Sequence, residues 1–140
     1  MTDGFDLQRF VDAQAPVYQR VLTELRQGRK QSHWMWFIFP QLAGLGHSAM
    51  AQHFAIASRD EASAYLGHGV LGPRLRECTA LVNAVDGRTI REILGSPDDL
   101  KFCSSMTLFG AVSPDPEFGE AIAKFYSGVQ DRKTLDLLAS

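Results

Sequence analysis

Cysteine is scarce in this 140-residue sequence, no hydrophobic run is long, and neither sign of charge predominates. The two cysteines, Cys78 and Cys103, form no CxxC pair and lie on apolar helical stripes, so we expect two small buried side chains in a reduced, cytoplasmic protein. The most apolar run, residues 34–39, is far shorter than the ~20 residues that cross a bilayer, so no membrane span is expected there. The formal net charge of −2 and the lack of a basic stripe with exposed aromatics argue against nucleic-acid binding.

Motifs for metals, cofactors and export are missing as well. There is no HExxH, no EF-hand loop and no Cys/His cluster at zinc spacing, so we expect neither a metal nor a cofactor. The N-terminal residues are acidic and no basic region leads into an apolar stretch, so no secretory signal is expected. With 45% hydrophobic residues, no fixed-period repeat and no long linker, the sequence predicts a single domain over residues 1–140 that buries its own core.

Apolar residues at helical spacing recur along most of the sequence. Its clearest apolar stripe, at steps of four, three, four and three residues, is formed by Leu71, Leu75, Cys78, Val82 and Val85. Start and stop signals predict further helices near residues 6–11, 16–28, 89–95, 96–110, 114–126 and 131–138, with Asp6, Thr89 and Ser96 as capping residues. No alternating β-branched run with hairpin turns occurs, and one strand-like run at 34–39 cannot make a sheet. We therefore predict an all-α, compact bundle of about six to eight helices with orthogonal rather than coiled-coil packing.

The segment 28–49 differs from the rest, because it holds both tryptophans and two of the four histidines. Large aromatics beside a few polar groups are typical of a small-molecule pocket. The candidate residues of this pocket are Lys30, His33, Trp34, Trp36 and Gln41. The alternative is that the aromatic side chains belong to the core and that His33 bonds a backbone carbonyl.

Residues 44–49 match the dinucleotide-binding pattern GxGxxA in form only. That pattern functions after a strand in a βαβ unit, and here Pro40 interrupts the supposed strand and no second strand follows. We therefore expect no nicotinamide-cofactor fold. A glycine turn that leads into a helix can still offer backbone N–H groups to an anion.

Two further segments could contact an anion. Lys101 lies near three hydroxyl residues, among them Ser105 and Thr107, and could bind a phosphate or activate a serine; the alternative is that these hydroxyls bond back to their own helical turn. His68 lies in a glycine-rich turn just before Arg74, which sits in the first turn of a helix, where its charge is unfavourable. Either a salt bridge or a bound phosphate or carboxylate would explain that arginine.

The block of residues 33–41, HWMWFIFPQ, together with Gly28, Lys30 and the glycines at 44 and 46, resembles a bacterial family known as domain of unknown function eighteen-ten. The likeness continues through residues 61–75 and 98–109, and so covers nearly the whole chain. Some members carry the name calpastatin, but that inhibitor is disordered and built of repeats, and this chain is neither.

The resemblance implies a mainly α-helical domain without an assigned activity. The polar positions that it carries over are Lys30, His33, Gln41, His68, Arg74, Lys101, Ser105 and Thr107. One departure is Gly69, where the family pattern leads us to expect a proline, and this loosens the turn that holds His68.

The leading hypothesis is a pocket for a small anionic, phosphate-bearing or nucleotide-like ligand. Its wall would come from Trp34 and Trp36, and its polar contacts from Lys30, His33, Arg74 and Lys101, with Gln41, His68, Ser105 and Thr107 as further candidates. His33 would be the general acid/base of a hydrolysis or group transfer. The rival hypothesis is a non-catalytic protein-interaction module in which these residues are structural, and the sequence does not decide between the two or give the oligomeric state.

Overall fold

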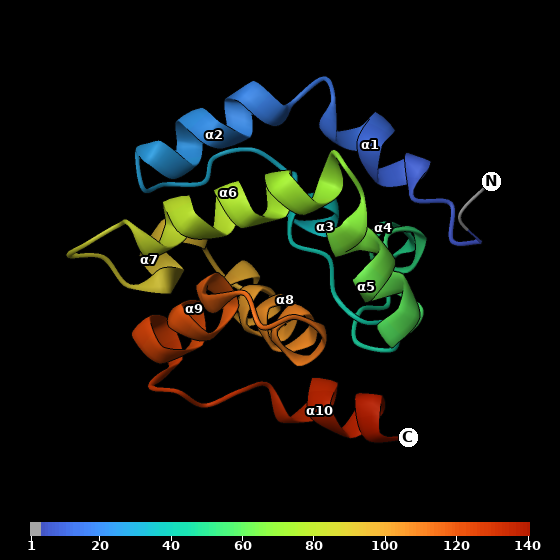
Figure 1. The fold of residues 1–140 in the computed structure, drawn as a ribbon. Helices are drawn as coiled ribbons and strands as arrows, with labels where there is room; N and C mark the ends of the chain where they lie inside the picture. Colours follow the sequence, from blue (N-terminus) through green and yellow to red (C-terminus); the bar gives the residue numbers. More distant parts are fainter. Residues whose placement is uncertain (1–3) are drawn as a thin grey trace.

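Ten helices make up the regular structure of residues 4–140, the part of the chain that the computed structural model describes (Figure 1). They are α1 (Gln8–Gln14), α2 (Tyr18–Arg26), α3 (Met35–Ile38), α4 (Ala49–His53), α5 (Arg59–Gly67), α6 (Leu71–Asn83), α7 (Ile90–Leu94), α8 (Asp98–Val112), α9 (Pro116–Tyr126) and α10 (Arg132–Ala139). Within residues 4–140, the β contacts are limited to one isolated bridge between Leu42 and Ile56. The all-α prediction is confirmed.

The number of helices exceeds the predicted six to eight, because the chain between residues 34 and 67 is more helical than the sequence analysis expected. Two of the additional helices, α3 and α4, are four and five residues long. The third, α5, has a clear start signal, since the Ser58 side chain accepts a hydrogen bond from the Glu61 backbone and two acidic residues lie in the first turn. None of the helices described is long and apolar enough to cross a membrane, and the N-terminal residues 1–3 lie outside the described part.

Helix α8 lies at the centre of the packing. Every residue from 102 to 109 is buried, so this helix presents no polar stripe to solvent over two turns. It contacts α5, α7, α9 and α10, while α6 contacts α2, α5 and α9. In Figure 1, α2 and α6 run across the view and α8 is seen nearly end-on, as the predicted orthogonal packing requires.

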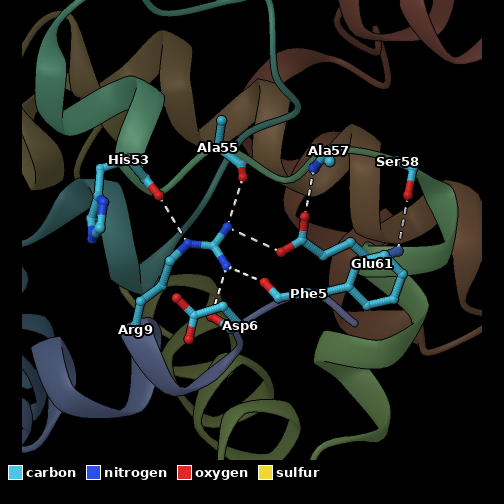
Figure 2. Close-up of polar contacts among 8 residues, drawn as sticks. All are labelled: Phe5, Asp6, Arg9, His53, Ala55, Ala57, Ser58 and Glu61. Atoms are coloured by element: carbon cyan, nitrogen blue, oxygen red, sulfur yellow. Dashed lines mark hydrogen bonds and ion pairs between the residues drawn. The ribbon is translucent and has the colours of Figure 1, made fainter. Parts of the chain in front are cut away.

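Arg9 ties α1 to the segment that connects α4 and α5 (Figure 2). Its Nε donates to the carbonyl of His53, and Nη2 donates to the carbonyl of Ala55 and to Glu61 Oε2 at 3.0 Å. Nη1 donates to two carbonyls of the chain that enters α1, so all five guanidinium donors are used. Glu61 in turn accepts from the backbone N–H of Ala57 at 2.7 Å. The irregular segment between α4 and α5 is thereby held in place by the side chains of Arg9 and Glu61.

Helices α5 and α6 approach each other closely where their connection turns back. A methyl group at Gly72 would lie 2.1 Å from the carbonyl oxygen of Leu66, which is backbone and cannot rotate away. Glycine is therefore the residue that this crossing needs, and its position in the first turn of α6 is a packing requirement.

We predict that Gly72→Ala lowers the free energy of unfolding by about 1–3 kcal/mol, because two helices must move apart to admit the methyl group. The matched control is Gly119→Ala in α9, where an added methyl group meets no atom within 4 Å and the change should raise stability by up to ~1 kcal/mol. Denaturant unfolding of both variants measures the difference. Equal effects from the two substitutions would contradict the close contact.

Candidate functional site

Two hollows meet on the surface beside the N-terminal half of α8. The smaller has a volume of about 390 Å³ and is lined by Lys30, His33, Met35, Trp36, Asp98 and Lys101. The larger, of about 590 Å³, includes Gln41, Leu45, Leu100, Lys101, Tyr126 and Val129 in its lining. Because Pro97 and Lys101 line both, the two hollows adjoin each other, and together they are called the cleft, with a smaller and a larger lobe.

Lys30 reaches the smaller lobe from the loop that follows α2. The loop leaves α2 through Gly28, whose φ of 73° is readily adopted by glycine. The Lys30 backbone N–H then donates to the carbonyl of Ile93 at 2.7 Å, which anchors the loop on α7. Its Nζ lies 2.9 Å from Asp98 Oδ2 and 5.2 Å from the ring centroid of Trp34. The ammonium group is thus fixed between a carboxylate and an aromatic face.

The carboxylate of Glu24 shapes the chain between Lys30 and α3. One oxygen accepts from the backbone N–H groups of Gln31 and Ser32 and from the indole N–H of Trp34, and the other accepts from the Ser32 hydroxyl. Burial would raise the pKa of Glu24, but these hydrogen bonds outweigh it and hold the pKa below its ordinary value. The ionised carboxylate therefore fixes the turn on which Lys30 and His33 lie.

Lys101 and Trp36 complete the smaller lobe from α8 and α3. The Lys101 Nζ lies 5.9 Å from the ring centroid of Trp36 and 4.0 Å from Asp98 Oδ1. Asp98 therefore stands between two ammonium groups and offsets one of their charges. The lobe keeps an excess positive charge next to a half-buried indole.

His33 and Gln41 are also in the cleft. His33 is exposed and lines the smaller lobe, and Gln41 is half-buried and lines the larger one. The structure thus brings together five predicted site residues: Lys30, His33, Trp36, Gln41 and Lys101.

Trp34 lies beneath the cleft and not in its wall. Its side chain is buried and its indole N–H is bonded to Glu24 at 3.0 Å. A ligand in the cleft does not reach this ring, so its contribution is to support Lys30 from below.

His68 and Arg74 lie away from the cleft. His68 Nδ1 accepts from the backbone N–H groups of Val70 and Leu71, so the imidazole occupies the start of α6. The Arg74 guanidinium lies 4.5 Å from the ring centroid of Tyr18 and donates to the side chain of Gln14. Neither residue lines the two lobes.

Ser105 and Thr107 are buried inside the packing around α8. The Thr107 hydroxyl donates to the Cys103 carbonyl at 2.8 Å and accepts from the backbone N–H of Asp131. The Ser105 hydroxyl has no hydrogen-bond partner within the described residues and lines neither lobe. Thr107 thus follows the alternative in which a hydroxyl bonds back to its own helical turn, whereas the buried Ser105 hydroxyl makes no such bond.

The sequence analysis missed two residues on which the cleft depends. Glu24 holds the loop that carries Lys30, and Asp98 is the ion-pair partner of Lys30. For Asp98 a local signal existed, because it precedes Lys101 by three residues on the same helix. Glu24 gave none, since a glutamate in an amphipathic helix is ordinarily a solvated side chain.

The glycine pattern at residues 44–49 forms no dinucleotide-binding turn. Ser48 caps the five-residue helix α4, and the adjoining backbone makes only the isolated bridge to Ile56. Over residues 4–140, no group of three or more His, Cys, Asp or Glu side chains is arranged to hold a metal ion.

Comparison with known proteins agrees with the sequence resemblance. The family model described as "Protein of unknown function (DUF1810)" matches residues 4–138. The chain is similar to the crystal structure of the conserved hypothetical protein Rv1873 from Mycobacterium tuberculosis, with 60% sequence identity, a TM-score of 0.97 and coverage of 99% of each chain. No curated protein matches the sequence.

We predict that Glu24→Gln lowers the free energy of unfolding by about 1.5–3 kcal/mol at neutral pH, because four hydrogen bonds to an ionised acceptor are lost or weakened. A carboxyl whose pKa is lowered by folding adds stability above its unfolded-state pKa, and this stability is lost as the pH falls through the folded-state pKa. The difference between wild type and variant should therefore shrink below pH ~4.

Urea unfolding followed by tryptophan fluorescence at several pH values measures this difference. The control is Glu120→Gln, which removes the same charge from an exposed position on α9 and should change the free energy of unfolding little at any pH. If the difference in the free energy of unfolding between wild type and Glu24→Gln stays constant down to acid pH, the Glu24 carboxylate is not the ionised acceptor described above.

Proposed function

Because the chain belongs to the DUF1810 family, whose description names no activity, we propose its function from the cleft: it binds a small anionic, nucleotide-like ligand. One observation carries the proposal. Lys30 and His33 come from the loop between α2 and α3, Lys101 comes from α8, and the three side chains line the same hollow beside Trp36. Convergence of polar groups on an apolar wall is the usual composition of a small-molecule site.

The charges of the smaller lobe favour an anion. Lys30 is largely buried, with 9% of its side chain exposed, and Lys101 is 27% exposed, so their charges are less screened than those of surface lysines. An ammonium group that bonds a phosphate or carboxylate makes a charge-assisted hydrogen bond. The two lobes together have the size of a metabolite pocket.

Asp98 tunes this site in two ways. Its carboxylate holds the ammonium group of Lys30 in place, and it also repels an incoming anion. Replacing it with the neutral amide keeps the shape of the side chain and removes the repulsion. Asp98 is therefore the residue at which loss of a charge should strengthen binding.

We predict that Lys30→Gln and Lys101→Gln weaken phosphate binding about tenfold each, whereas Asp98→Asn strengthens it severalfold. NMR titration of the 15N-labelled protein with inorganic phosphate and AMP, at constant ionic strength, gives the Kd and shows whether the Trp36 indole signal moves. Arg20→Gln, which removes one positive charge from an exposed position on α2, is the matched control and should leave the Kd unchanged.

The proposal predicts that Asp98→Asn lowers the Kd for phosphate, whereas the two lysine variants raise it. If neither phosphate nor AMP moves the signals of the cleft, the protein is not an anion-binding protein of this kind. The protein-interaction module then becomes the better account of the chain.

His33 is the side chain through which turnover of a bound ester would pass. An imidazole both accepts and donates protons near neutral pH, and His33 shares the lobe with the two lysines. Release of phosphate from a bound phosphate ester, abolished in His33→Asn while the Kd is kept, would add hydrolysis to binding. Unchanged ligand over long incubation would assign the cleft to binding alone.

A further inference from the structure

We propose that the larger lobe is the subsite for a heteroaromatic ring, so that the ligand is a phosphate monoester that carries its ring next to Lys101. The inference rests on the proposed function, because it places the anion of that ligand in the smaller lobe. It adds the chemistry of the remaining part of the molecule.

Exposed apolar side chains gather at the larger lobe. In the described part of the chain, four large hydrophobic residues are exposed, and two of them, Leu100 and Val129, line this lobe. They are also the most exposed of the four, at 65% and 67%, while the other two are at 36% and 40%. Two such side chains in the lining of one hollow provide apolar surface that a bound ring would remove from water.

Three of the polar side chains that line this lobe, those of Tyr126, Ser104 and Cys103, already have partners within the protein. The Tyr126 hydroxyl donates to the Asp99 carbonyl, so this residue offers its ring and not its hydroxyl to a ligand. The Ser104 hydroxyl lies 3.3 Å from the Leu100 carbonyl and 3.2 Å from Asp131 Oδ2, and the Cys103 thiol faces the Val129 carbonyl. A ligand group beside these three residues therefore finds mainly apolar contacts, which fits a ring better than a sugar or a peptide backbone.

Gln41 supplies the contrasting polar group. It is half-buried in the lining, and its side-chain amide has no hydrogen-bond partner among residues 4–140. An amide offers both donors and an acceptor, the pattern that matches the edge of a nitrogen-containing ring. The lobe thus combines apolar side chains with the half-buried, unpaired amide of Gln41, and the exposed Gln130 lies in the same lining.

The position of Lys101 indicates how far apart the phosphate and the ring of the ligand lie. Its side chain lines both lobes, so a phosphate beside it and a ring in the larger lobe lie within the reach of one small molecule. A nucleoside monophosphate has this arrangement, and phenyl phosphate is its simplest analogue.

The experiment compares inorganic phosphate, phenyl phosphate and AMP by NMR titration of the full chain at constant ionic strength. Phenyl phosphate should bind about tenfold tighter than phosphate, because the ring buries apolar surface. Leu100→Ser and Val129→Ser should remove most of that gain and leave the phosphate Kd unchanged. Gln41→Ala should weaken AMP severalfold and leave phenyl phosphate unchanged, because the phenyl ring has no hydrogen-bonding edge.

Val70→Ser truncates an exposed valine outside both lobes and serves as the control for the two apolar variants. If phosphate binds but phenyl phosphate and AMP bind no more tightly, the ring subsite is wrong while the anion site stands. The ring subsite is also wrong if Leu100→Ser and Val129→Ser weaken phosphate as much as phenyl phosphate. If none of the three probes binds, the proposed function itself fails.

Discussion

The cleft depends on one buried carboxylate, that of Glu24. The chain between α2 and α3 has no regular structure, so the backbone N–H groups of Gln31 and Ser32 lack helical partners. Glu24 accepts from both of them and from the Ser32 hydroxyl and the Trp34 indole. The same contacts hold the loop that carries Lys30 and His33 into the cleft, so the positions of these two candidate side chains depend on a buried hydrogen-bond network.

A second glutamate has the same function elsewhere in the molecule. Glu61 accepts from Arg9 and from the Ala57 backbone, and it holds the segment between α4 and α5 as Glu24 holds the segment before α3. In both cases a carboxylate accepts backbone N–H groups that a helix would otherwise have paired. Side chains thereby hold two irregular segments of the N-terminal half, and the one before α3 carries Lys30 and His33 into the cleft.

Local patterns in the sequence predicted which segments are helical better than they predicted where each helix begins. Four members of the predicted stripe, Leu71, Leu75, Cys78 and Val82, are buried, whereas the fifth, Val85, is half-buried and lies beyond the end of α6 at Asn83. Thr89 forms the predicted cap, in this case a full capping box with Glu92. The expected caps at Asp6 and Ser96 are wrong, because the N-cap positions of α1 and α8 are Leu7 and Pro97, whose side chains do not cap these helices. For the site, aromatic and basic composition pointed to the segment that holds Lys30, His33 and Trp36. Composition alone did not distinguish the buried Trp34 from the half-buried Trp36, and it did not reveal the pairing of Lys30 with Asp98, which depends on how distant helices pack.

The hydrogen bond from Lys30 to Ile93 has a consequence for the order in which the protein matures. It joins the loop after α2 to a helix made much later in synthesis, and the ion pair with Asp98 does the same one step further along the chain. A ribosome that has released only the first half of the chain therefore exposes Lys30 without the partners that position it. Because synthesis runs from the N-terminus, the surroundings of Lys30 in the cleft are complete only when α7 and α8 have been made.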